Sequence, residues 1–252
     1  MILILLSSVP AGTMPEKVQL SFLQLLYEAT IALVNISEES CNKILSPVIS
    51  VLIEMLVINQ KIAKFANNQL CFIINNCIRP SLWRKKRDEL SLEAMALEEE
   101  GREFTKVVCL FQGLLSSRFP DKKLAANLVS LFFSQLEEDA FPETLELIQR
   151  VVEYHSELDD KKFNKIMESI IMAFGVENMI KMYPLSLSGD IGSETFEEEN
   201  NLWMLSCIEK TERGEKMTIF NQYLSPLLEH ARAMNIQMST SSKQRQEAYR
   251  LI

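Results

Sequence analysis

The strongest candidate for binding chemistry is a short basic stretch between two expected helices. Residues 79–87, RPSLWRKKR, combine five cations with one tryptophan and contain no acid. Lysine and arginine neutralise phosphate charge, and an indole ring can stack on an exposed base. The residues that could make such contacts are Arg79, Trp83, Arg84, Lys85, Lys86 and Arg87. The stretch therefore predicts a contact with RNA or with an acidic partner.

The same stretch also fits simpler interpretations. Residues 88–100 follow it directly and hold six acids, which could pair with the cations in a solvated loop between helices. Basic runs of this length also serve as nuclear-import peptides. Trp83, close to Pro80, could be a packed anchor instead of a platform for a base. The sequence leaves these alternatives open.

Residues that could catalyse a reaction or hold a metal do not converge in the sequence. The two histidines, His155 and His230, have no HExxH motif or His–Cys spacing around them, and no GxxxxGK[ST], GxGxxG or GxSxG is present. The acidic clusters at 98–100 and 197–199 lack the ligand spacing of a calcium loop. We expect no enzyme, no metal, no cofactor and no small-molecule substrate. An enzyme subunit missed by these motifs would need a deep pocket with convergent polar groups.

Charge and cysteine content narrow the class of protein. A net charge of −8 argues against nucleic-acid binding over the whole surface, although a local basic patch is compatible with it. Five cysteines without a CxxC pair are typical of reduced core thiols and predict an intracellular, reducing compartment. The N-terminal MILILL has no basic residue before it and is too short for a signal or a membrane span. We expect no membrane partner.

The elements that must position the basic stretch are helices. Glycine and proline are sparse, at seven and eight residues, and apolar residues recur at the helical period almost throughout. Pro15, Pro120 and Pro142 are expected at first helical positions, where a missing N–H costs nothing. The pattern predicts helices at 15–35, 38–58, 60–78, 88–117, 120–137, 142–156, 159–174, 176–182, 200–211 and 214–234.

Ten short helices with tight connections form either a closed bundle or a stacked array. Helix starts at 38, 88, 120 and 159 permit the period of about forty residues found in HEAT and armadillo repeats. We therefore predict an all-α solenoid of stacked antiparallel helix pairs, forming a single domain over residues 1–252. Residues 186–200 are acidic and contain glycine, which predicts a flexible surface loop.

Residues 173–228 carry a more specific pattern. The segment AFGVE at 173–177 is followed by YPLSL at 183–187, then by WML at 203–205 and FNQYLSPL at 220–227. In order, spacing and residue type this pattern resembles the HEAT-repeat family of ribosomal RNA-processing proteins of the "twelve" type. The resemblance implies structural motif positions at Gly175, Pro184, Leu185, Trp203, Phe220, Pro226 and Leu227.

The resemblance also implies a role. Members of this family are non-catalytic α-solenoid scaffolds of the nucleus and nucleolus, which act in ribosomal RNA processing, pre-40S assembly and nuclear export. The implied partners are proteins of the pre-ribosomal particle and ribosomal RNA, with nuclear transport factors as further candidates. Because family members are much longer, the chain is expected to be a fragment of a longer solenoid or a reduced homologue. The alternative is a karyopherin-like or general HEAT-repeat adaptor that binds proteins without RNA.

Overall fold

Every regular element of the described chain is a helix, which confirms the all-α prediction. The computed structural model describes residues 2–9, 14–82, 93–186, 201–210, 220–226, 228–229 and 232. The chain divides into two compact units, residues 1–166 and 167–252. A single repeat domain over the whole chain, and its origin as a fragment, stay predictions. The expected loop at 186–200 lies outside the described residues except for Ser186.

The first unit consists of helices. Its α-helices are α1 (Ile2–Leu6), α2 (Glu16–Ile36), α3 (Glu38–Met55), α4 (Gln60–Cys77), α5 (Glu93–Leu114), α6 (Lys122–Phe133), α7 (Phe141–Glu153) and the beginning of α8 (Asp160–Phe174). Single 3-10 turns, at Pro80–Leu82, Glu138–Ala140 and His155–Glu157, lie in the connections. Apart from α1, each of these α-helices falls on a predicted helix.

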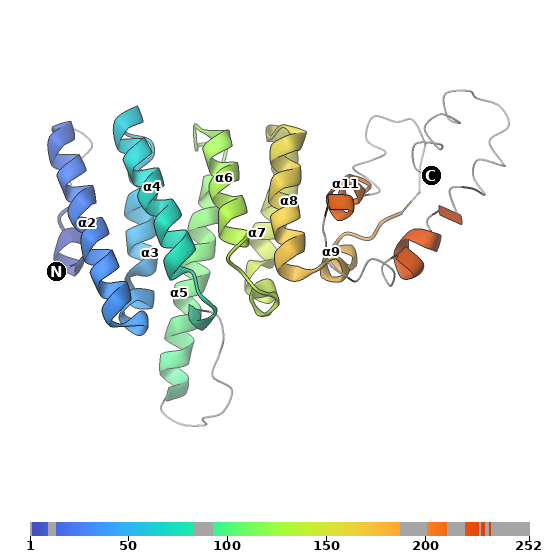
Figure 1. The fold of residues 1–252 in the computed structure, drawn as a ribbon, viewed down its shortest axis with the longest axis horizontal. Helices are drawn as coiled ribbons and strands as arrows, with labels where there is room; N and C mark the ends of the chain where they lie inside the picture. The colour runs from blue at the N-terminus through green and yellow to red at the C-terminus, as the bar shows by residue number, and fades with distance from the viewer. Residues whose placement is uncertain are drawn as a thin grey trace. The chain divides into compact units, whose positions relative to one another are not determined.

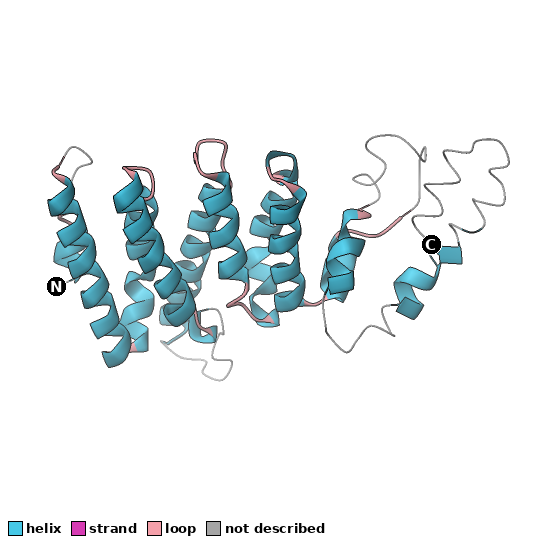
Figure 2. Cartoon of the chain, turned by 45° about the horizontal axis from the view of Figure 1, so that its top comes forward, coloured by secondary structure: helices cyan, strands magenta, loops and turns pink. Residues whose placement is uncertain are grey.

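These helices stack in two layers (Figures 1 and 2). In one layer α2 contacts α4 and α4 contacts α6, while in the other α3 contacts α5 and α5 contacts α7. Successive helices, such as α2 and α3 or α3 and α4, also pack on each other across the layers. Helices α2 to α7 therefore pack on neighbours one or two places along the chain, the arrangement of antiparallel pairs in an α-solenoid. The predicted architecture is confirmed.

Polar side chains fix where several of these helices begin. Ser37 caps α3, Asn59 caps α4 and Asp121 caps α6, each by accepting hydrogen bonds from backbone N–H groups of the first turn. The acceptor distances are 3.2 Å at Ser37, 3.0 Å from Ile62 to Asn59, and 2.9 Å at Asp121. A side-chain oxygen here replaces the carbonyl that a first-turn N–H lacks. Short capped connections let each helix reverse direction and pack on the one before it.

The three prolines lie near helix starts but not at the first helical position. Pro15 is the N-cap of α2, Pro120 precedes the capping Asp121, and Pro142 is the second residue of α7. The prediction was wrong by one or two residues. The physical reason is that a proline lacks only its own N–H, and the whole first turn has free N–H groups, so all of these places tolerate it.

The core of the first unit lies between the layers. Phe104 and Phe111 of α5 meet Phe132 of α6, and the rings of Phe111 and Phe132 stack with centroids 4.2 Å apart. All three side chains are fully buried. Within the α2–α4 layer, the buried Gln69 amide donates to the Leu23 carbonyl at 2.8 Å and ties the two helices together.

The second unit is described over shorter stretches. It holds the end of α8, then α9 (Val176–Met182), α11 (Trp203–Lys210) and a π-helical turn at Phe220–Leu224. Val176, Met179 and Ile180 of α9 are buried, as are Met204 and Cys207 of α11. Helix α9 has the predicted bounds, and α11 lies within the predicted 200–211.

Candidate functional site

The predicted basic stretch is described only at its beginning. Arg79 follows α4, is exposed, and donates from Nε to the Asn76 carbonyl at 2.9 Å. The other predicted contact residues, Trp83, Arg84, Lys85, Lys86 and Arg87, lie outside the described residues. Whether these six residues contact a partner is therefore still a prediction.

Described cations gather at the opposite edge of the first unit, where α2, α4, α6 and α8 begin. Alternate helices of a solenoid run in the same direction, so these four starts lie along one edge, the top in Figure 1. Lys17, Lys64, Lys123 and Lys161 each lie in the first or second turn of one of these helices and are exposed. We call this edge, with its lysines, the basic edge.

Several other lysines at the basic edge are paired with acids. Lys61 Nζ of α4 lies 2.6 Å from Glu16 Oε1 of α2, and Lys122 Nζ of α6 lies 2.8 Å from Glu157 Oε2. Exposed pairs of this kind contribute little to stability, but they neutralise one another's charge. In contrast, the described contacts give Lys17, Lys64 and Lys123 no ion pair, so their charge is available to a partner.

A groove runs between α2 and α4 below the basic edge. Its volume is about 650 Å³, and its lining includes Lys17, Lys61, Lys64, Gln24, Asn68 and Phe65. A second groove of about 410 Å³ separates α4 from α6 and shares Lys64 with the first. Asn59, Gln60 and Asn67 line that second groove. The exposed side of α4 thus presents cations and amides to two adjoining hollows.

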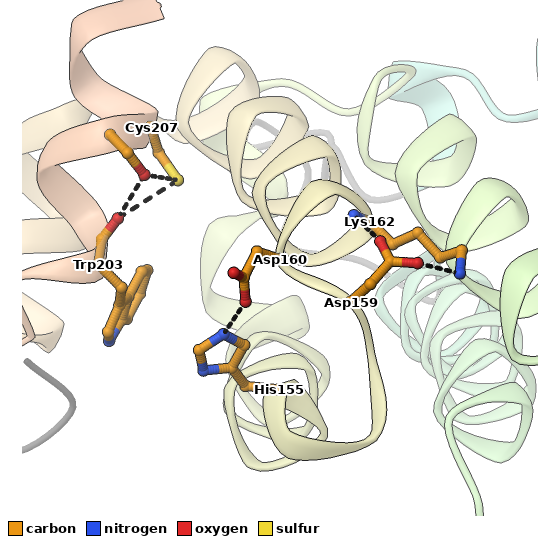
Figure 3. A network of polar contacts seen from close by, with 7 residues as sticks. His155, Asp159, Asp160, Lys162, Trp203 and Cys207 are labelled. Atoms are coloured by element: carbon orange, nitrogen blue, oxygen red, sulfur yellow. Dashed lines mark hydrogen bonds and ion pairs between the residues drawn. The ribbon is translucent and has the colours of Figure 1, made fainter. Parts of the chain in front are cut away.

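The connection between α7 and α8 holds a polar cluster (Figure 3). Asp159 Oδ1 accepts the Lys162 backbone N–H at 2.9 Å, and the other carboxylate oxygen pairs with the Lys162 ammonium. These bonds to Lys162 hold the pKa of Asp159 below its usual range. His155 stacks on Phe163 with ring centroids 3.9 Å apart, and its Nε2 lies 3.8 Å from Asp160 Oδ1. The contacts fasten the turn and the start of α8, which is a structural role.

The thiols of Cys71 and Cys77 are held in their protonated form. Cys77 of α4 hydrogen-bonds Cys41 of α3, and this bond together with burial raises the pKa of Cys77 strongly. Burial also raises the pKa of Cys71. A thiol is a poor nucleophile when it is protonated, so these residues do not resemble catalytic cysteines. The compartment predicted from cysteine usage stays a prediction.

Metal binding and membrane insertion are two further functions to which the described residues are relevant. Within the described ranges, no group of three His, Cys, Asp or Glu side chains is arranged to hold a metal ion. Among the described helices, α2 alone is long and apolar enough to cross a bilayer by length and composition. Its side chains Phe22, Leu23 and Leu26 are buried, and it packs on α3 and α4. A third of the apolar window of α2 is buried in this packing.

In the second unit, the predicted motif begins with a backbone break. Gly175 donates its N–H to the Ile171 carbonyl at 2.8 Å, ends α8, and is the N-cap of α9 with φ 84° and ψ 155°. Residues that carry a Cβ rarely adopt this backbone conformation, so glycine is required here. The break lets α9 begin at once in a new direction.

The motif continues on both sides of residues 187–200. The Asn201 side-chain amide donates to the Pro184 carbonyl at 3.0 Å, and the Trp203 ring meets the Tyr183 ring edge-on at 5.9 Å. Leu185 is half-buried, Phe220 begins the π-helical turn, and Pro226 is exposed. Leu227 lies outside the described residues.

The decisive comparison is with models of protein families. Residues 58–251 match the family described as ribosomal RNA-processing protein 12, HEAT repeats. The chain belongs to this family. The matched region contains the basic stretch at 79–87 and all the motif positions, whereas α2 precedes it. The resemblance stated from the sequence is confirmed, and its family of HEAT-repeat scaffolds is typically non-catalytic.

Comparisons with curated proteins and with solved structures gave no match. The groove between α2 and α4 was missed by the sequence reasoning. Its signal in the sequence is the polar set Lys61, Lys64 and Asn68 around Phe65, which recurs at helical spacing along α4. Lys17 and Gln24 join it only because α2 and α4 are neighbours in the same layer, as alternate helices of a solenoid are.

Proposed function

We propose that the chain is a non-catalytic α-solenoid scaffold of ribosome biogenesis that binds pre-ribosomal RNA and proteins. The observation that carries this proposal is the family match over residues 58–251, on a chain whose first unit stacks its helices as repeats. Stacked repeats offer long exposed faces and bind by surface contact.

The proposed setting is the nucleus and nucleolus, during pre-40S maturation and nuclear export. Partners in that setting are proteins of the pre-ribosomal particle and ribosomal RNA, together with nuclear transport factors. These finer roles are taken from the family. The net charge of the protein supports a contact with RNA that is restricted to one part of the surface. With a net charge of −8, only a local cluster of cations can attract RNA.

The proposed RNA contact is the basic stretch, formed by Arg79, Trp83, Arg84, Lys85, Lys86 and Arg87. Four consecutive cations at 84–87 can neutralise several phosphates, and Trp83 can stack on an unpaired base. Support for this contact comes from residue type and spacing, and from the position of the stretch inside the family match.

The test has two parts that use the full chain. The tagged protein is purified from nuclear extract, and precursor small-subunit RNA in the eluate is quantified. The purified chain is then titrated with structured ribosomal RNA over a salt series, beside a variant with Arg84, Lys85, Lys86 and Arg87 changed to alanine. We expect co-purification of the precursor and a salt slope that falls in the variant by roughly 0.9 per lost phosphate contact.

A control variant, Lys43→Ala with Lys106→Ala, removes exposed cations from α3 and α5 and should bind as the unaltered chain does. Co-purification of precursor particles without RNA binding by the chain itself would favour the protein-only adaptor. Absence of precursor RNA and of particle proteins from the eluate would refute the proposed function.

A further inference from the structure

The groove between α2 and α4 combines three kinds of side chain. Cations stand at its upper end, where Lys17 and Lys64 are exposed and Lys61 is paired with Glu16. Amides follow along its walls, Gln24 from α2 and Asn68 from α4. The half-buried side chains of Leu20 and Phe65 add an apolar part to the lining.

Each kind of group matches one part of a nucleotide. Lysine ammonium groups neutralise phosphates, and side-chain amides donate to and accept from phosphates, sugars and base edges. An aromatic ring supports a base by stacking. The volume of about 650 Å³ lies within the usual range for ligand sites, which leaves room for a nucleotide unit.

We propose that this groove binds a single-stranded segment of RNA, with Lys17 and Lys64 on phosphates and Phe65 against a base. The inference deepens the proposed function and rests on it, because it names a second RNA contact apart from the basic stretch. It also uses α2, which precedes the family match. The contact is therefore one that the match does not supply.

Two other ligands fit the groove less well. An acidic peptide would satisfy the lysines but would bring carboxylates against the apolar Leu20 and Phe65, which costs desolvation. Duplex RNA keeps its bases stacked inside the helix, so it offers the Phe65 ring no base to meet. A single strand offers both a charged backbone and free base faces.

The experiment measures binding of a short labelled oligouridine to the full chain by fluorescence anisotropy over a salt series. The first variant carries Lys17→Ala and Lys64→Ala. Because both lysines are exposed, the fold should be kept, and we expect weaker binding with a salt slope reduced by about 1.4 for two lost phosphate contacts. The control is again Lys43→Ala with Lys106→Ala, two exposed lysines that pair with Glu39 and Glu103, for which no change in slope is expected.

The second variant, Phe65→Leu, keeps an apolar side chain and removes the ring. We expect affinity roughly tenfold lower at fixed salt, with an unchanged salt slope, because stacking and not charge is lost. Circular dichroism spectra of all variants should match that of the unaltered chain. The pair of variants thus separates the phosphate contact from the base contact.

Three results would overturn the inference. One is oligouridine binding that neither groove variant alters. Another is oligoglutamate binding that depends on Lys17 and Lys64 but not on Phe65, which would make the groove a site for acidic peptides. The last is tighter binding of duplex RNA than of the single strand at this groove. In each case, co-purification of precursor RNA with the groove variants would show that the proposed function stands without this contact.

Discussion

Gly175 is the residue on which the end of α8 depends. Its φ of 84° and ψ of 155° belong to a region that residues with a Cβ avoid, and its N–H still closes the last turn of α8. The backbone must take this conformation for α9 to start at Val176 with its apolar face buried. One residue therefore sets the direction of the next helix.

Gly175→Ala should lower the free energy of unfolding by about 1–3 kcal/mol, because the added Cβ makes this backbone conformation strained. The midpoint of urea unfolding, followed by circular dichroism, measures the effect. Gly113→Ala is the matched control, since a Cβ at Gly113 of α5 would meet nothing within 4 Å. In a helix this change should be neutral or stabilising by about 0.5–1 kcal/mol. Equal effects of the two changes would contradict the argument.

Asp159 predicts a specific pH dependence. Its pKa is lowered in the folded chain by its hydrogen bonds to Lys162, so the unfolded chain takes up a proton first as pH falls. The stabilisation is present above the unfolded value of about 3.9 and is lost as pH falls through the lower folded pKa. Asp159→Asn should therefore be less stable than the unaltered chain at neutral pH, and the difference should vanish in acid.

Urea unfolding of both proteins from neutral to strongly acid pH measures this difference. Glu146→Gln removes an exposed carboxylate of α7 instead, and it controls for the change in net charge. A constant difference between the unaltered chain and Asp159→Asn at every pH would mean that the carboxylate charge has no part in the effect.

At the scale of the elements, local signals decided what the sequence could predict. Helix α9 has the predicted bounds, and α4 begins where predicted, because glycine and asparagine mark these starts by their own backbone and capping chemistry. Helix α6 ends at Phe133, whereas the predicted end was residue 137. The turn that begins at Ser134 contains no glycine or proline from which it could be predicted. The π-helical turn at Phe220–Leu224 lies within the helix predicted at 214–234, because periodicity marks a helical stretch but does not distinguish a π-turn from an α-helix.

Local signals also limit which candidate sites can be predicted from the sequence. A run of cations such as 84–87 is visible in the sequence because its members are adjacent. The α2–α4 groove is not visible, because Lys17 and Lys64 are far apart in the chain and meet only when two helices of one layer pack together. Predicting it requires the register of α2 against α4, which the apolar pattern leaves undetermined.

At the scale of the whole molecule, stacking makes interactions local along the first unit. Helix α2 packs mainly on α1, α3 and α4, and α6 on α4 and α5. Arrays of this kind are stabilised by contacts between neighbours, so damage at one place is felt most by adjacent helices. The net charge likewise hides a local pattern, because an acidic total of −8 coexists with the basic edge.

Phe132→Leu tests this locality. Phe132 stacks on Phe111 in the core between α5 and α6, and loss of the ring should lower the local free energy of opening by about 1–2 kcal/mol. Hydrogen exchange should accelerate in α5 and α6 more than in α2. Leu26→Val changes a buried side chain of α2, so it should accelerate hydrogen exchange in α2 more than in α5 and α6. Equal acceleration in all helices of the first unit would show instead that it opens as one cooperative body.

The hydrogen bond between Asn201 and Pro184 has a practical consequence for protein engineering. At 3.0 Å it joins Pro184, three residues before 187–200, to Asn201, which directly follows that segment, so the two flanks are held together by a contact outside it. Loop closure costs only slightly more as a loop lengthens. A fluorescent protein inserted between these flanks should therefore leave α9 and α11 intact, which gives a way to follow the chain in living cells while both of its termini stay free.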